Sequence, residues 1–202
     1  MKQKHKFIIF EGIDGCGKST QIKNVVSFLF DQDKHNHVVL TRNPYLDVNI
    51  RAILREDNDP HKKSEELADL FIADRVKHAK ELVTPNLKKG FYVVCDRYIF
   101  STVAYQSAQG LDMAKLLAKQ AKLPKPDITF IVDVSAKEAS KRMRKDAGNR
   151  QEHKFEANLD FLEKVRQNYL KLGKIKSFGK IVVIDGTKTR EKVFENIIKK
   201  LK

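Results

Sequence analysis

The residues best suited to chemistry lie near the N-terminus, in the segment FEGIDGCGKST that spans residues 10–20. Gly12, Gly17, Lys18 and Ser19 match the spacing GxxxxGK[ST], after an apolar run and before a helix-like stretch. Glycines there let backbone N–H groups face one anion, Lys18 reaches the terminal phosphates, and the Ser19 hydroxyl joins a magnesium shell. The segment predicts a nucleoside triphosphate site with Mg²⁺. Its expected nucleotide contacts are Gly12, Asp14, Gly15, Cys16, Gly17, Lys18, Ser19 and Thr20.

The fate of the terminal phosphate separates two classes of protein. A switch GTPase would need a guanine-reading segment similar to NKxD, and the sequence contains none. Phosphoryl transfer is catalysed mainly by positioning and charge neutralisation, for which this chain offers many basic residues. The sequence therefore favours transfer to a second, anionic substrate.

Five short apolar runs must position this chemistry. They are β-branched or aromatic and apolar on both faces, as strands buried in a parallel sheet are. Helix-like stretches separate them, so we expect an α/β fold with a doubly wound five-stranded parallel sheet flanked by helices. The runs lie in residues 6–12, 37–44, 91–98, 127–134 and 180–186, and the helix-like stretches are 18–30, 64–83, 112–121, 135–145, 158–172 and 190–202.

Composition limits the remaining possibilities. With 202 residues, 41% of them hydrophobic, we expect one domain over residues 1–202. No signal peptide or membrane span is predicted, and Cys16 and Cys95 form no disulfide or metal-ligand pattern, so we expect a cytoplasmic protein. The net charge of +14 attracts polyanions, but the lysines are spread along the chain without interleaved aromatic residues. Nucleic acid is therefore not the expected partner.

The segment DRYIFSTVAYQ, Asp96–Gln106, resembles the thymidylate kinase family. It is similar to that family's DRY signature followed by the S-x-x-A-Y-Q pocket helix, and with Asp14 of the P-loop it differs from adenylate and guanylate kinases. The resemblance runs over most of the chain. It implies a P-loop NTPase fold with a short helical lid at about 137–156, transfer of a phosphoryl group from ATP to dTMP with Mg²⁺, and a homodimer.

The resemblance also implies roles on the acceptor side. Arg97 would bind the dTMP phosphate, Asp96 would lie near the magnesium, and Asp14 would contact the sugar 3′-hydroxyl. Phe71 would stack on thymine and Arg75 would hydrogen-bond a base carbonyl. Taken singly, these residues have ordinary interpretations as core, surface ion pair or strand-end turn, and their joint order and spacing carries the functional interpretation. The other expected dTMP contacts are Arg51 for the phosphate, Thr102 and Gln106 for the base edge, Tyr105 beneath the deoxyribose, and Ser101.

The basic segment Lys137–Lys154 corresponds to the lid of the family. Some members carry a catalytic arginine in the P-loop where this chain has Gly15, and members with glycine there supply the arginine from the lid. The resemblance thus implies Arg144 or Arg150 at the transferred phosphoryl group and Arg142 near adenine. A solvated basic helix end is the alternative for each, and which arginine is catalytic stays open.

Two departures from the family pattern concern the segment after the second apolar run. The usual T-R-E-P is TRNP here, so Asn43 replaces a carboxylate, and the loop after it is shortened to YLDVNI. A cis Asn43–Pro44 bond is an option. Strict choice of dTMP is therefore left open. The alternatives are a kinase of this fold for another nucleoside monophosphate, a non-catalytic ATP-binding module, and redox control through Cys16 and Cys95.

Overall fold

The computed structural model describes residues 6–46, 50, 64–147 and 159–201. Within this part of the chain, five strands form one parallel sheet in the order β2-β3-β1-β4-β5. The chain starts in the middle of the sheet and crosses over in both directions, which confirms the doubly wound α/β prediction. The strands are β1 (Phe7–Glu11), β2 (Val38–Arg42), β3 (Tyr92–Asp96), β4 (Ile128–Asp133) and β5 (Lys180–Asp185).

The burial of each strand explains its residue types. All five residues of β1 are buried, as are the first four of β3 and the first five of β4, so these strands read as continuous apolar runs. The edge strands β2 and β5 keep several exposed positions and carry lysine, arginine or threonine. The expectation that all five runs are buried on both faces is therefore confirmed for β1, β3 and β4 and is wrong for the edge strands β2 and β5.

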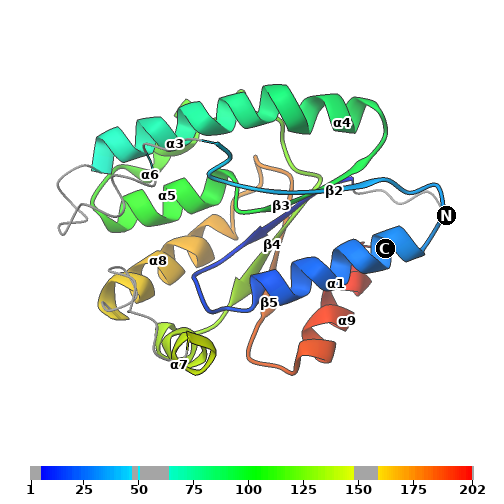
Figure 1. The fold of residues 1–202 in the computed structure, drawn as a ribbon. Coiled ribbons are helices and arrows are strands. Elements are labelled where there is room, and N and C mark those ends of the chain that lie inside the picture. Colours follow the sequence, from blue (N-terminus) through cyan, green and yellow to red (C-terminus); the bar gives the residue numbers. More distant parts are fainter. Residues whose placement is uncertain (1–5, 47–49, 51–63, 148–158, 202) are drawn as a thin grey trace.

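Helices cover both faces of the sheet (Figure 1). Helix α1 packs with α9, while α5 packs with α8 and α3, and these two groups lie on different sides of the central strands. The helices are α1 (Lys18–Asp31), α3 (Ser64–His78), α4 (Thr84–Lys88), α5 (Ile99–Ala108), α6 (Met113–Lys119), α7 (Ala136–Ala147), α8 (Leu159–Leu172) and α9 (Arg190–Leu201).

The helix expected over 64–83 is present but interrupted. A π-helical turn, η1 (Ala79–Val83), follows α3 and leads directly into α4. Pro85, which has no backbone N–H to donate, lies in the first turn of α4 directly after this π-helical turn. Within the segment expected to form a lid, the structure describes the helix α7, and residues 148–158 lie outside the described residues, so the lid stays a prediction.

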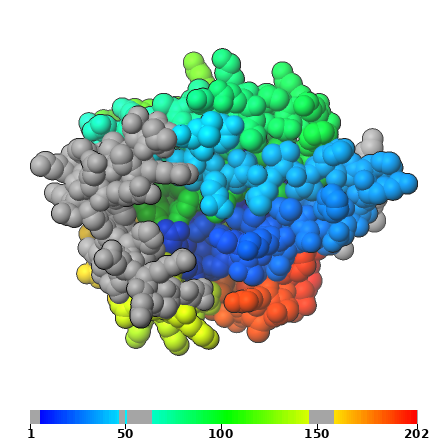
Figure 2. Space-filling model, viewed as in Figure 1, coloured from blue at the N-terminus to red at the C-terminus, as the bar shows by residue number. Residues whose placement is uncertain are grey.

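The carboxyl ends of the strands lie along one edge of the sheet. Strand register aligns Phe10 with Asp96, and Arg42 with the same Asp96, so the exits of β1, β2 and β3 are neighbours. With all atoms drawn, α1 lies in the middle of the visible face, between the segment that contains β2 and α9 (Figure 2). Among the described helices, none has the length and apolar character to span a membrane.

Candidate active site

The loop between β1 and α1 begins with a glycine that packs against β4, a neighbour of β1 in the sheet. Gly12 has φ 135°, and a Cβ added to it would lie 2.5 Å from the carbonyl oxygen of Val132. Lys18 begins α1 and is buried, and its Nζ donates to the carbonyl oxygens of Gly12 and Ile13, both at 2.9 Å. The ammonium thus lies inside the loop, beside the backbone amides that would hold phosphate oxygens.

Helix α7 closes the other side of this loop. A Cβ on Gly15 would lie 2.4 Å from the carbonyl oxygen of Ala139 and 2.8 Å from Cγ of Met143, and Gly15 has φ 78°. A P-loop arginine at this position would therefore displace α7. Arg142 of α7 donates through Nη1 to the carbonyl oxygen of Gly186, at 3.1 Å, just beyond β5.

Arg97 joins the exit of β3 to the P-loop. Its Nη2 donates to Oδ1 of Asp14 at 2.5 Å, and the same carboxylate oxygen lies 3.7 Å from Nζ of Lys18. The guanidinium also donates to Oγ of Ser101 at 3.0 Å and lies 5.2 Å from the ring centroid of Tyr105. Burial alone would lower the pKa of Arg97, but attraction from Asp14 and other neighbours outweighs it, so the pKa lies well above its ordinary value. Arg97 is therefore a fixed cation.

Glu11, which the sequence analysis missed, organises the turn behind Arg97. Its fully buried carboxylate accepts hydrogen bonds from the backbone N–H of Tyr98 at 2.8 Å and of Ser101 at 3.2 Å. Its other oxygen accepts from Oγ of Ser101 at 2.6 Å and from the hydroxyl of Tyr169 at 3.1 Å. A buried carboxylate requires such donors, and here they fix the start of α5.

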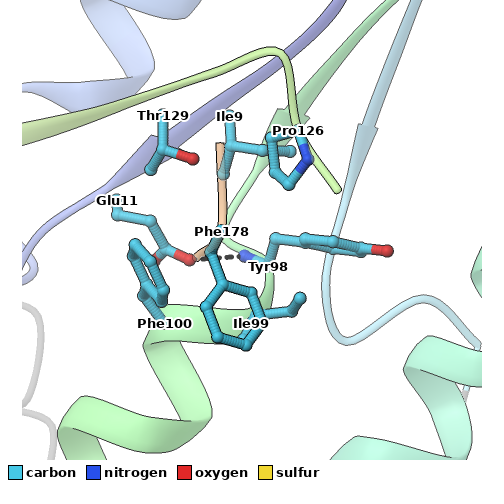
Figure 3. A pocket seen from close by; sticks show the side chains of 8 residues that line it. All are labelled: Ile9, Glu11, Tyr98, Ile99, Phe100, Pro126, Thr129 and Phe178. Atoms are coloured by element: carbon cyan, nitrogen blue, oxygen red, sulfur yellow. Dashed lines mark hydrogen bonds between the residues drawn. The ribbon is translucent and has the colours of Figure 1, made fainter. Parts of the chain in front are cut away.

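A small cavity lies beside Glu11 (Figure 3). It is lined mainly by apolar side chains, including Phe100 and Phe178, and its volume is about 10 Å³. That is room for about one water molecule. This cavity is therefore too small for a nucleotide, and neither Arg97 nor a residue of the loop between β1 and α1 lines it.

Arg75 is a buried guanidinium at the inner face of α3. Only 1% of its surface is exposed, and its Nη atoms donate to Oε1 of Gln120 and, at 2.8 Å, to Oγ1 of Thr102. Burial lowers its pKa, and attraction from Glu11 opposes that effect. Its Nε has no hydrogen-bond partner within the described residues. Gln120, whose role the sequence did not reveal, thus orients a predicted substrate residue.

Gln106 on α5 has a buried acceptor atom, Oε1, whereas the atom of Arg75 without a partner among the described residues is a donor. It is 3% exposed, its Nε2 donates to Gln109 at 3.3 Å, and its Oε1 has no partner in the part of the chain that the structure describes. Buried polar atoms are rarely left without hydrogen bonds in folded proteins. A ligand acceptor would satisfy Nε of Arg75, and a ligand donor would satisfy Oε1 of Gln106.

Similarity to known proteins covers nearly the whole chain. The family model described as thymidylate kinase matches residues 10–197. The chain belongs to the thymidylate kinase family. A probable thymidylate kinase of Pyrococcus horikoshii is 37% identical over 198 residues, covering 95% of this chain and 93% of that protein. A thymidylate kinase of Thermosipho africanus is 38% identical over 198 residues, covering 95% and 94%.

A solved structure shows the same fold. The crystal structure of thymidylate kinase from Ehrlichia chaffeensis matches with a TM-score of 0.75 and 30% sequence identity, covering 97% of this chain and 98% of that one. As a family member, the chain is a thymidylate kinase enzyme, and ATP-dependent phosphorylation of dTMP is its activity.

The two residues expected to contact magnesium, Ser19 and Asp96, carry oxygen atoms of the kind that Mg²⁺ binds. Oδ1 of Asp96 is buried and has no partner among the residues that the structure describes, while Ser19 is exposed at the start of α1. No group of three or more His, Cys, Asp or Glu side chains among those residues forms a dedicated metal cage. Mg²⁺ suits such a site, because it commonly takes one or two protein oxygens together with phosphates and water.

Of the remaining residues predicted to contact dTMP or ATP, some lie in the part of the chain that the structure describes and two do not. Phe71 is half-buried on α3, and Tyr105 is half-buried with its ring centroid 6.3 Å from that of Phe161. Arg144 is exposed on α7. Arg51 and Arg150 lie outside the described residues, so their proposed roles rest on the family resemblance alone.

Both cysteines are free and buried. Burial, aided by Glu11 and Asp96, raises the pKa of Cys95 well above its ordinary value, which disfavours the thiolate. Cys16 lies 3.8 Å from Nζ of Lys18. The peptide bond between Asn43 and Pro44, for which the sequence left the cis form as an option, is cis.

Proposed function

We propose that this chain transfers the terminal phosphoryl group of ATP to the phosphate of dTMP, assisted by Mg²⁺, through the residues described above. One observation carries the assignment: a single oxygen of Asp14 lies 3.7 Å from the Lys18 ammonium and 2.5 Å from the Arg97 guanidinium. The cation suited to the donor phosphates and the cation suited to the acceptor phosphate thus flank one point. Phosphoryl transfer requires both phosphates to meet there.

On the donor side, the P-loop would bind ATP. The loop amides and Lys18 would hold its phosphates, and Ser19 and Asp96 would hold Mg²⁺, which neutralises phosphate charge when it is bound. Arg142 would lie near the adenine. Because α7 fills the space at Gly15, the further positive charge at the transferred group would come from Arg144 or Arg150 rather than from the P-loop.

On the acceptor side, the unpartnered atoms match a thymine ring. Thymine offers carbonyl acceptors and one N–H donor, and the pocket offers Nε of Arg75 and Oε1 of Gln106. Thr102 would contact the base edge, Phe71 would stack on the ring, and Tyr105 would pack under the deoxyribose. Arg97, with Arg51, would hold the phosphate.

The reaction then needs no general base, because an oxygen of the dTMP phosphate is already a competent nucleophile. It attacks the terminal phosphorus of ATP as the bond from that phosphorus to the bridging oxygen breaks, giving dTDP and ADP. Lys18 and the arginines stabilise the charge that develops on the transferred group. Asp14 keeps Arg97 oriented and would contact the 3′-hydroxyl.

We also propose that residues 1–202 act as one domain with a lid at about 137–156, that two copies pair through helices, and that the protein is cytoplasmic. The pairing rests on the family resemblance. The free cysteines suit a reducing compartment.

The test of the substrate is a coupled ADP-release assay with ATP and Mg²⁺ against dTMP, dUMP, dCMP, dGMP and AMP. Selective turnover of dTMP supports the proposed pocket. Preference for another monophosphate would show that the Asn43 loop has changed the substrate.

A further inference from the structure

Asn43 lies where the exit of β2 meets the exit of β3. It is 6% exposed, and its backbone N–H donates to the carbonyl oxygen of Asp96 at 3.0 Å. Its side-chain Nδ2 donates to the carbonyl oxygen of Arg97 at 3.1 Å and lies 3.5 Å from Sγ of Cys95. Asn43 therefore donates hydrogen bonds to two consecutive carbonyl groups, those of Asp96 and Arg97.

The backbone at Arg97, which accepts the hydrogen bond from Asn43, is strained. Arg97 has φ 66°, a region that residues with a bulky side chain rarely adopt. Such a conformation persists only where the surroundings hold it. The N–H of Arg97 donates to the carbonyl oxygen of Phe10 at 2.9 Å, and its carbonyl accepts from Asn43 and from the Cys95 thiol at 3.1 Å. The peptide groups on both sides of the residue are thus held.

An amide is required for the side-chain bond. A carboxylate offers only acceptors, so aspartate or glutamate at position 43 would set an oxygen against the Arg97 carbonyl oxygen. The reverse orientation of the Asn43 amide would do the same, which fixes Nδ2 toward Arg97. A carboxylate would also add negative charge beside Asp96 and oppose the binding of an anionic acceptor.

We infer that Asn43 is a positioning residue for acceptor binding: its amide holds the Arg97 backbone so that the guanidinium lies against Asp14 and Tyr105 and is ready for the acceptor phosphate. This inference rests on the proposed role of Arg97 in the dTMP kinase reaction. It gives Asn43 a role that the acid usual in the family pattern cannot fill in the same way.

The test compares Asn43→Asp, which is nearly isosteric, with Asn43→Ala and the wild type. Loss of the donor beside a buried carbonyl is expected to raise KM for dTMP about tenfold in Asn43→Asp, with a smaller rise in Asn43→Ala. KM for ATP should change less than about twofold, because the P-loop is not held by Asn43. A role in stability alone would lower the melting temperature without this separation of the two KM values.

A matched control is Asn36→Asp, because Nδ2 of Asn36 also donates to a backbone carbonyl, that of Leu29 at 2.7 Å, away from the P-loop and Arg97. It should leave both KM values unchanged. An unchanged KM for dTMP in Asn43→Asp, or equal rises in KM for dTMP and ATP, would overturn the inference. If Asn43→Asp does not fold, the same criteria apply to Asn43→Ala.

Turnover by the wild type tests the proposed function separately. If another monophosphate is preferred, the comparison of KM values uses that substrate, since Arg97 would contact the phosphate that all monophosphates share.

Discussion

The acceptor side and the donor side of the site are held by different means. On the acceptor side, Arg75 and Glu11 are buried and form hydrogen bonds with Thr102 and Ser101, respectively. Arg97 donates to Ser101 and to the half-exposed Asp14. On the donor side, Ser19 is exposed at the start of α1, and Arg144 is exposed on α7. The chain alone thus fixes the groups that would choose the acceptor. On the donor side it fixes Lys18, which is buried and donates to two P-loop carbonyl oxygens, but it leaves Ser19 and Arg144 at the surface.

This difference has an energetic meaning. Preorganised groups cost little further ordering when a ligand binds, so they favour affinity and selectivity. Groups that are ordered only on binding can respond to the presence of both substrates. We therefore expect changes on the acceptor side to act on dTMP binding, and changes on the donor side to act on the rate of transfer.

The largest expected effect is on the donor side, at Lys18. Lys18→Ala removes the ammonium inside the P-loop and should lower kcat by about 10²- to 10³-fold or more, because charge stabilisation of the transferred group is lost. Steady-state ADP release gives kcat, and titration calorimetry should show nearly unchanged dTMP affinity. Lys23→Ala, an exposed change on the same helix, should be silent. Full activity of Lys18→Ala would refute the site.

The corresponding change on the acceptor side is Arg97→Ala. It removes the cation that would hold the acceptor phosphate and should lower kcat/KM for dTMP by about 10²-fold, since the loss of one member of a close charge pair leaves the phosphate without its partner. ATP affinity, measured by calorimetry, should change far less. Loss of ATP and dTMP binding to the same degree would contradict the separation between the two sides.

The sequence revealed some of this arrangement and could not reveal the rest. Apolar runs and the P-loop spacing predict the sheet and the phosphate site because both are local patterns. Glu11 and Gln120 escaped notice, since their partners Tyr169 and Arg75 lie 158 and 45 residues away in sequence. Glu11 did carry a signal: a lone carboxylate at the end of a fully apolar run must find buried donors.

A smaller effect should follow from changes around Arg75. Arg75→Ala should raise KM for dTMP by about tenfold or more and KM for ATP much less, because a charged hydrogen-bond donor leaves the base pocket. Gln120→Leu should shift KM for dTMP in the same direction but less, since it removes only the acceptor that orients the guanidinium. Steady-state kinetics with each substrate varied checks both. Equal shifts in both KM values would mean that Arg75 is not in the base pocket.

The change with the smallest expected effect on catalysis concerns the pH dependence of stability, at His78 of α3. His78 is fully buried, with Nε2 2.8 Å from Oγ1 of Thr41, and burial lowers its pKa to about 4 from an ordinary value near 6.5. Between these values the unfolded chain binds a proton that the folded chain does not. The free energy of unfolding should therefore fall as pH decreases from about 6.5 to about 4.

Urea unfolding across that range measures the effect. His78→Gln should show a shallower fall in unfolding free energy, while the exposed control His35→Gln should follow the wild type. Parallel pH curves for His78→Gln and the wild type would show that His78 titrates normally in the folded state.

The most direct measurement is the dissociation constant of dTMP, determined by calorimetry with and without a non-hydrolysable ATP analogue and Mg²⁺. Because the chain itself holds the acceptor-side residues in position, we predict that dTMP binds without the analogue and that its dissociation constant changes by less than about threefold when the analogue is added. Binding of dTMP only after the donor site is filled would contradict the account, since the acceptor pocket would then depend on the nucleotide for its formation.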